Sequence, residues 1–366
     1  MSILIFIIIL LVLVLVHEFG HFFTAKKFGI RVDEFGFGFP PKLFGKKFGE
    51  TEYTVNLLPL GGFVRIFGET PDEESVNGPD ALRSFINKAR WKQAIVLVAG
   101  VFMNFLLAWL LFSLAFISGR PTSVRQGELA GYELQDVNLV IVSIVADSPA
   151  AEAGLKPGDK ILAIGKGEEI VSEVTPVALQ SFVAKSEGKE IFVNYQRGDS
   201  AETVQARILP KVQNGTPIIG IAMDEVGTAK MGFFKSFAEG FTLTRLVTQE
   251  TAMGLYKLIK DGLTGAGSLE SITGPVGLVG VVGDAYQFGF AYLISFAALI
   301  SINLGIINLL PFPALDGGRL LFLLIEKIKG SRMNLKMVNA ANSIGFIILI
   351  LLMLLVTYND IAKILS

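Results

Sequence analysis

Four stretches of the chain are apolar for about the length that a membrane crossing requires. An α-helix spans the hydrocarbon core of a bilayer with about 20 residues. The first stretch has no cationic start and no small-residue cleavage site, so we interpret it as a retained helix and not as a signal peptide. The last is short and reaches the required length when it is tilted or extended by residues 339–343. The pattern predicts four transmembrane helices, at residues 3–25, 94–117, 290–310 and 344–358.

Basic residues flank these stretches unevenly. They gather between the first and second stretches and between the third and fourth, and the positive-inside rule places both connections in the cytoplasm. The long polar segment 119–289 and both ends of the chain are then expected on the outer side. The basic residues concerned are Lys26, Lys27, Arg83, Lys88, Arg90 and Lys92 in one connection and Arg319, Lys327, Lys329, Arg332 and Lys336 in the other.

The outer segment shows the pattern of a small β-rich domain. Residues 139–145 and 160–164 are rich in Val and Ile and lie between turns that contain Pro and Gly. A helix is expected at residues 176–184, and a later hairpin turns at residues 197–200. The pattern predicts a β-rich domain inserted between the second and third transmembrane helices.

Short motifs between the first two expected strands point to a more specific fold. Ser-Pro-Ala at residues 148–150, Ala-Gly-Leu at 153–155 and Pro-Gly-Asp at 157–159 follow one another. As a set, they resemble the series found in bacterial PDZ domains, which offer an exposed sheet edge to an extended peptide. The alternative is a β-rich domain without a peptide groove.

Beyond this domain, large apolar residues recur at helical spacing from Phe233 to Ile259. This spacing predicts an amphipathic helix. Such a helix can lie on the outer leaflet of the membrane or pack on the PDZ-like domain, and the sequence leaves both placements open.

Composition limits the chemistry that the chain can perform. Hydrophobic residues make up 51% and the mean hydropathy is +0.56, which indicates a membrane part beside a water-exposed part. The formal net charge of -1 gives no basic excess for nucleic acid, so nucleic acid is not an expected partner. The chain contains no cysteine, so any metal must be bound by His, Asp or Glu.

The two histidines of the chain lie four residues apart within the first apolar stretch, in the sequence His17-Glu18-Phe19-Gly20-His21. On a helix, this spacing puts both imidazoles on one face, where they can bind one Zn²⁺ with Glu18 as the base toward an activated water. Ionisable groups at membrane depth cost on the order of several kcal/mol and usually serve function. The alternative, two neutral histidines hydrogen-bonded between helices, explains neither Glu18 nor the spacing. The pattern predicts a buried zinc site near the cytoplasmic boundary.

A catalytic zinc site usually has three protein ligands, and an acid must supply the third one here. The best candidate is Asp316, at the inner end of the third stretch. Pro311 and Pro313 prevent a regular helix there, and a sharp turn is possible at residues 317–318, which are both glycine. The alternative role of Asp316 is a helix N-cap. A histidine pair that needs an acid favours the ligand.

The order of these features resembles a known family. An HExxH helix, a cytoplasmic loop, a second helix, a PDZ-like domain, a third helix with Asn-x-x-Pro-x-Pro-x-Leu-Asp-Gly and a fourth helix are all present. The chain resembles the site-2 protease family of intramembrane zinc metalloproteases, specifically the bacterial regulator-of-sigma-E protease group. The resemblance implies that Asp316 is the third zinc ligand. It also implies that Asn308, Pro311 and Pro313 belong to the substrate-binding region.

Residues 58–65, Leu-Pro-Leu-Gly-Gly-Phe-Val-Arg, resemble the membrane-reentrant β-hairpin of this family. The resemblance implies a hairpin at about residues 52–67 that offers a strand edge to the substrate. The alternative is an ordinary cytoplasmic hairpin. The expected substrate-binding residues of the hairpin are Gly61, Gly62, Phe63 and Val64.

Two features depart from the family pattern. Val101 follows Gly100 where the family usually has proline, which predicts a straighter second helix. The chain has room for one PDZ domain where many relatives have two, which puts their substrate-gating arrangement in doubt.

The resemblance also implies a fold, a location and partners. The expected fold is a polytopic α-helical protein of the bacterial inner membrane, with four transmembrane helices, an inserted β-rich PDZ-like domain outside, a membrane-associated β-hairpin and an active site near the cytoplasmic side. Expected substrates are single-pass membrane proteins that an upstream site-1-type protease has shortened, such as anti-sigma factors, or remnant signal peptides. The expected domains are residues 1–118 (two helices and the loop with the hairpin), 125–226 (PDZ-like), 229–286 (amphipathic connector) and 287–366 (two helices).

Two other functions compete with this one. A zinc protease of the prenyl-protein-processing kind also places HExxH in a membrane, but a glutamate from a later helix would be its third ligand. Apart from Glu326, the acid near the late helix-breaking segment is Asp316. The non-enzymatic alternative is a membrane-anchored PDZ scaffold or quality-control factor with a structural metal site.

Overall fold

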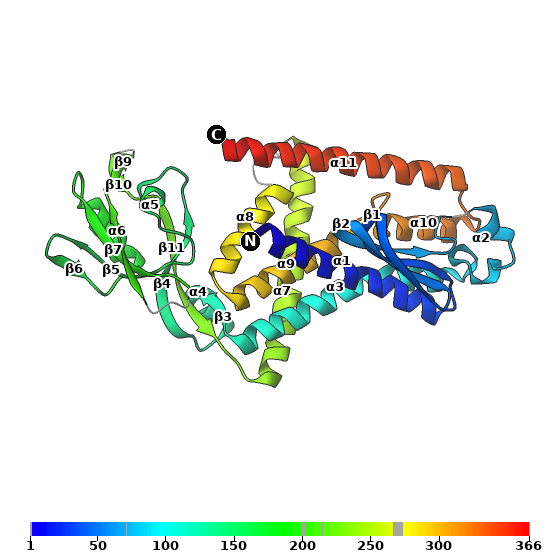
Figure 1. Ribbon diagram of the computed structural model, residues 1–366, viewed down its shortest axis with the longest axis horizontal. Helices are drawn as coiled ribbons and strands as arrows, with labels where there is room; N and C mark the ends of the chain where they lie inside the picture. Colours follow the sequence, from blue (N-terminus) through cyan, green and yellow to red (C-terminus); the bar gives the residue numbers. More distant parts are fainter. Residues whose placement is uncertain (1, 71, 199–201, 214, 266–273, 366) are drawn as a thin grey trace. The chain divides into compact units, whose positions relative to one another are not determined.

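Four of the helices that the structure describes are long and apolar enough to cross a membrane, as the hydrophobic pattern predicts (Figure 1). They are α1 (Ser2–Lys27), α3 (Arg90–Ser118), α9 (Phe290–Leu309) and the span Lys336–Ala362 within α11 (Leu335–Leu365). The structure is a computed structural model and describes residues 2–70, 72–198, 202–213, 215–265 and 274–365.

The last of these helices is longer than the apolar pattern indicates. Helix α11 begins at Leu335, whereas the pattern places the start of the span at residue 344. The polar residues that hide this start include Asn342, whose side-chain oxygen accepts the N–H of Ala314 at 3.2 Å. Asn342 therefore binds the loop before α10 at the point where it interrupts the apolar run.

Contacts divide the chain into two compact units. The membrane unit comprises Met1–Phe112, Gly240–Gly280 and Ala297–Ser366, and the second unit comprises Ser113–Glu239 and Val281–Phe296. The second unit contains the β-rich domain.

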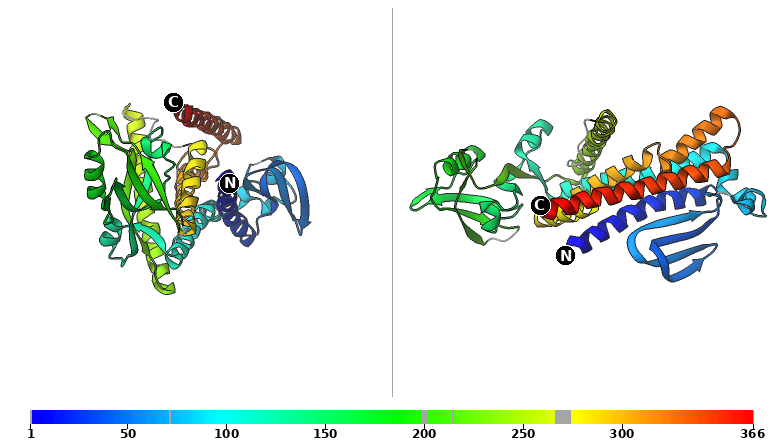
Figure 2. Two further views of the ribbon diagram at one scale, coloured as in Figure 1. Left: turned by 60° about the vertical axis from the view of Figure 1, so that its left-hand side comes forward. Right: turned by 90° about the horizontal axis from the view of Figure 1, so that it is seen from above.

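In the membrane unit, two long antiparallel strands pack against α1, and both views in Figure 2 show them beside that helix. They are β1 (Val32–Phe48) and β2 (Thr51–Ile66). The segment 52–67, expected to form a hairpin by itself, supplies only the second strand. The first strand, β1, was not expected, because its alternating Phe and Gly residues are more typical of a loop. The glycine at position 36 leaves room for the ring of Phe63, which would collide with any side chain there.

The β1–β2 sheet is bent so that one segment of β1 has partners on both sides. Phe35 pairs with Val64 near the end of β2 and also with Tyr53 near its beginning. The end of β2 therefore forms an edge of this sheet. This edge is the part of the sheet that reaches the candidate site.

The inserted domain is β-rich, as expected. Six strands follow one another in the order β3-β11-β4-β5-β7-β8, with β6 paired to β5, and neighbouring strands run antiparallel. The turn expected at residues 197–200 falls partly outside the described residues, but its flanking strands pair as a hairpin. The strands are β3 (Arg120–Ser123), β4 (Gln135–Ile144), β5 (Lys160–Lys166), β6 (Glu169–Val171), β7 (Ile191–Gln196), β8 (Thr203–Ile208) and β11 (Ile221–Ala229).

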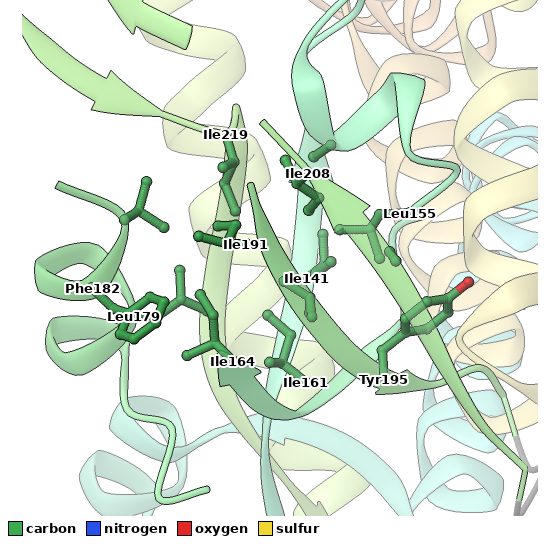
Figure 3. Packing of buried hydrophobic residues seen from close by; sticks show 14 of the residues in the cluster. Ile141, Leu155, Ile161, Ile164, Leu179, Phe182, Ile191, Tyr195, Ile208 and Ile219 are labelled. Carbon is green, nitrogen blue, oxygen red and sulfur yellow. The ribbon is translucent and has the colours of Figure 1, made fainter. Parts of the chain in front are cut away.

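Helix α6 (Pro176–Ala184) covers one face of this sheet and completes its core. Figure 3 shows Leu179 and Phe182 from α6 beside the side chains of the strands. Thr175 caps the helix by accepting the N–H of Ala178 at 3.2 Å, which explains where α6 begins. The buried residues of this core include Ile141, Leu155, Ile161, Ile164, Ile191, Tyr195, Ile208 and Ile219. The domain also carries the short elements α4 (Val124–Ala130), α5 (Pro149–Glu152), β9 (Lys211–Gln213) and β10 (Thr216–Ile218).

The expected amphipathic helix is α7 (Phe233–Thr264). Its residues Leu243, Val247 and Leu255 pack against an apolar cluster of α3 and α9 that is centred on Phe112 and Ile302. Residues 266–273 of the expected connector lie outside the described residues, and α8 (Pro275–Gln287) follows them. One face of α7 is therefore covered by two of the membrane-type helices, a placement that the sequence did not suggest.

Candidate metal centre

His17 and His21 project from one face of α1 and are nearly inaccessible, at 5% and 6% exposed. Their Nε2 atoms lie 3.1 Å apart. The helical spacing of four residues puts the two rings on the same face of α1. The residues around them on this helix are mostly apolar. Nδ1 of His21 lies 2.9 Å from the carbonyl oxygen of Val96 on α3, so a neighbouring helix holds that ring.

Asp316 reaches the same point from a distant part of the chain. Helix α9 ends at Leu309 and α10 (Asp316–Lys329) begins after a non-helical segment that contains Pro311 and Pro313. Ala314 adopts a left-handed conformation there, with φ 76°. The N-cap of α10 is Leu315 and not Asp316, so the alternative role of Asp316 as an N-cap is wrong.

The first turn of α10 requires the glycines at 317 and 318. A side chain at position 317 would lie 2.2 Å from the carbonyl oxygen of Leu310, and one at 318 would lie 2.1 Å from that of Phe312. Both distances are far below a van der Waals contact. The sharp turn expected at residues 317–318 is instead helical, and it packs closely on the loop that precedes it.

The three side chains fit a zinc ion. Oδ2 of Asp316 lies 3.2 Å from Nε2 of His17 and 3.3 Å from Nε2 of His21, and it is buried without a hydrogen-bond partner within the described structure. A tetrahedral ion with bonds of about 2.1 Å separates its ligand atoms by about 3.4 Å, close to these values. Burial alone would raise the pKa of the Asp316 carboxyl, but the two imidazole rings beside it hold that pKa well below its usual range. Two imidazoles and a carboxylate are a ligand set that suits zinc.

Glu18 lies beside this cluster and contacts the edge of the β1–β2 sheet. Its Oε2 accepts the backbone N–H of Val64 at 3.1 Å. Close packing of the sheet on α1 makes this possible, because a side chain at Gly62 would lie 2.9 Å from Leu15 and one at Gly61 would lie 3.4 Å from Val14. Of the expected substrate-binding residues, Val64 is therefore next to the candidate base, while Phe63 stacks on the ring of Phe39.

Other expected residues lie farther from the cluster. Asn308 is partly buried in the last turn of α9, and no hydrogen bond joins it to the two histidines or Asp316 within the part of the chain that is described. Pro311 and Pro313 shape the loop before Asp316, and the carbonyl oxygen of Pro313 lies 2.4 Å from where a side chain at Gly345 of α11 would be.

The sequence reasoning missed two residues of α3 that contact the histidines. A side chain at Gly100 would lie 2.3 Å from Nε2 of His21, so only glycine leaves room for the ring. The side-chain amide nitrogen of Asn104 lies 3.1 Å from Nδ1 of His17, and Asn104 is fully buried. Their spacing of four residues places both on one face of α3, which is the signal that was available in the sequence.

A buried set of two imidazoles and a carboxylate, with a second carboxylate beside it, is typical of a metal-dependent hydrolase, and the helices that carry it include ones long and apolar enough to cross a membrane. The model of Peptidase family M50 matches residues 5–352, and the chain belongs to this family. The expected relationship to the site-2 proteases is thereby confirmed, as is the expectation of a zinc metalloprotease.

Full-length relatives support this assignment. The regulator of sigma-W protease RasP of Bacillus subtilis is 33% identical over 98% of this chain and 97% of its own length. The zinc metalloprotease RasP of Geobacillus kaustophilus is 32% identical over 99% of this chain and 98% of its own. A chain from Clostridium perfringens is 34% identical over 95% of both chains.

One solved structure is similar to part of the chain. The PDZ domain of the SdrC-like protein from Listeria monocytogenes is 25% identical, with 25% of this chain and 92% of that chain covered and a TM-score of 0.20. A score this low carries no argument for the fold. The PDZ-like character of the β-rich domain therefore rests on its motifs.

Proposed function

We propose that this chain hydrolyses peptide bonds in or near the transmembrane segments of other membrane proteins, with His17, His21 and Asp316 as zinc ligands and Glu18 as the base. The single observation that carries the proposal is the convergence of the three donor atoms with Glu18 beside them. Bound zinc supplies a Lewis acid that polarises a carbonyl and makes water more acidic.

Glu18 moves the proton in this proposal. Its carboxylate accepts a proton from the attacking water as the new C–O bond forms, and it returns that proton to the amide nitrogen as the C–N bond breaks. The N–H of Val64 holds one carboxylate oxygen of Glu18 in place before substrate binds.

The edge of β2 is proposed to bind the substrate. A transmembrane helix hides its carbonyls in its own hydrogen bonds, so the substrate must unwind locally before any base can act on it. Pairing with the strand edge at Gly61, Gly62, Phe63 and Val64 would replace the lost bonds, and Val64 lies beside Glu18. Substrates with helix-breaking residues near the cleaved bond are therefore expected to be preferred.

The substrates are proposed to be single-pass membrane proteins that another protease has already shortened on the outer side. The Bacillus subtilis relative, a regulator of sigma-W protease, supports anti-sigma factors as one class. Remnant signal peptides are a second class. The distribution of basic residues supports a PDZ-like domain outside the bacterial inner membrane and an active site near the cytoplasmic face.

The test compares purified wild-type protein with Glu18→Gln on a single-pass membrane substrate in lipid nanodiscs. Removing a general base typically costs 10²–10⁴-fold in rate, so cleavage should fall by about that factor while zinc content stays unchanged. Glu187→Gln, at an exposed glutamate of the β-rich domain, is the matched control and should cleave normally. Cleavage by Glu18→Gln at the wild-type rate would show that Glu18 is not the base. A zinc-loaded wild-type protein that cleaves no membrane substrate would instead favour the scaffold with a structural metal.

A further inference from the structure

Asn104 is the feature of the metal centre that the proposed roles do not use. It lies in the middle of α3, is 0% exposed, and places its amide nitrogen 3.1 Å from Nδ1 of His17. Its amide oxygen is also buried and has no hydrogen-bond partner among the described residues. A buried amide with an unpaired oxygen is costly, so its position beside a candidate ligand calls for a chemical reason.

The Nδ1 atoms of the two histidines also need hydrogen-bond partners. Nε2 of each ring points at the Asp316 carboxylate and is the atom available to a metal. An imidazole that binds a metal through Nε2 carries its proton on Nδ1, and that N–H needs an acceptor. His21 has one in the carbonyl oxygen of Val96, at 2.9 Å.

We propose that Asn104 is the positioning residue of His17, and that its amide oxygen accepts the Nδ1–H of His17 when zinc is bound. This proposal rests on the proposed zinc site. Rotating the amide by half a turn about its last bond exchanges nitrogen and oxygen without moving any other atom, since the two ends have nearly the same shape. The amide then donates to His17 in the metal-free tautomer and accepts from it in the metal-bound one.

The surroundings of Asn104 hold it in place for this role. The Ser301 hydroxyl of α9 donates to the backbone carbonyl of Asn104 at 2.8 Å. A side chain at Gly305, one turn farther along α9, would lie 3.4 Å from the Asn104 Cβ. Helix α9 therefore holds the backbone of α3 at this residue. The Asn104 amide can still rotate about its last side-chain bond.

Two variants distinguish a hydrogen bond accepted by Asn104 from a role in packing alone. Asn104→Leu keeps the volume but removes the acceptor, and zinc affinity measured by competition with a chelator should fall about 10- to 100-fold. Asn104→Asp can accept but cannot donate, and its affinity should lie within a few-fold of wild type. Ser113→Ala, at another buried polar residue of α3, is the matched control and should not change zinc affinity.

A second measurement is independent of affinity. With only two histidines in the chain, ¹⁵N-histidine labelling should give two Nδ1–H signals in the zinc-loaded protein. In Asn104→Leu one of them should lose its hydrogen-bonded shift while the other, from His21 bound to Val96, stays in place.

Three outcomes would overturn the role of Asn104: wild-type zinc affinity in Asn104→Leu, an equal loss in Asn104→Asp, or a spectrum in which both signals or neither signal moves. Failure of the wild-type protein to bind zinc would instead refute the proposed metal site itself. The two failures are therefore distinguishable in one set of measurements.

Discussion

The metal centre and the core of the β-rich domain are built from opposite kinds of contact. The β-rich core consists of aliphatic and aromatic side chains from strands, helices and loops, and polar groups such as Ser148 and Thr175 cap its helices. The metal centre packs His17, His21 and Asp316 together, and it needs glycine where α3 passes the rings. The first arrangement is what stability alone favours, whereas the second is costly without a bound cation. The comparison indicates that function is concentrated where the packing violates ordinary preferences.

After Glu18→Gln, the largest loss of cleavage is expected from filling the space beside the imidazoles. In Gly100→Ala the new methyl group would lie 2.3 Å from Nε2 of His21, so the ring must move. A displacement of about 1 Å at a catalytic group can cost about 100-fold in rate, and we expect a cleavage loss of that order together with weaker zinc binding. Cleavage assays and zinc analysis check this. Gly254→Ala, where no atom lies within 4 Å of the added methyl, should behave as wild type.

An effect on stability and not on cleavage is expected in the β-rich core. Ile164 is fully buried there, and Ile164→Ala should lower the free energy of unfolding of the domain by about 2–5 kcal/mol. Amide hydrogen exchange in β5 and β7 measures this loss in the full-length protein. Zinc content should not change. Ile170→Ala, at an exposed position, should cost no more than about 0.5 kcal/mol, and a loss of zinc in Ile164→Ala would contradict the separation of the two regions.

The smallest effect is expected at a helix cap of the same domain. Ser148 accepts the N–H of Ala151 at 3.3 Å at the start of α5. Ser148→Ala should lower the free energy of unfolding by about 1 kcal/mol, which hydrogen exchange near α5 can measure. Ser181→Ala, at an exposed serine within α6, provides the comparison, and an equal loss in both variants would show that Ser148 is not acting as a cap.

Periodicity predicted the elements of both regions better than their limits. The second membrane helix, expected at residues 94–117, is α3, Arg90–Ser118. The strand β1 escaped notice because its alternating glycines suggest a loop, although Gly36 makes room for the Phe63 ring. The pattern allows the last helix to extend back to residue 339, whereas α11 begins at Leu335, because polar residues such as Asn342, which accepts the Ala314 N–H, interrupt the apolar run. In both cases the unexpected residue contacts a part of the chain that is distant in sequence.

The same reasoning explains what could be foreseen at the site. The spacing of His17 and His21 on one helix face is local, so the sequence predicts it. Asp316 followed from the need for a third ligand and from the family resemblance. Gly100 and Asn104 contact the histidines because α3 packs against α1. A single sequence does not show which helices pack together, and it shows only that these two residues share one face of α3.

Anomalous X-ray scattering at the zinc edge from crystals of the wild-type protein would locate the metal and its ligands. We expect one strong peak at about 2.0–2.2 Å from Nε2 of His17, Nε2 of His21 and a carboxylate oxygen of Asp316. A zinc peak elsewhere, or one bound by the histidines with the Asp316 carboxylate out of coordination range, would contradict this expectation.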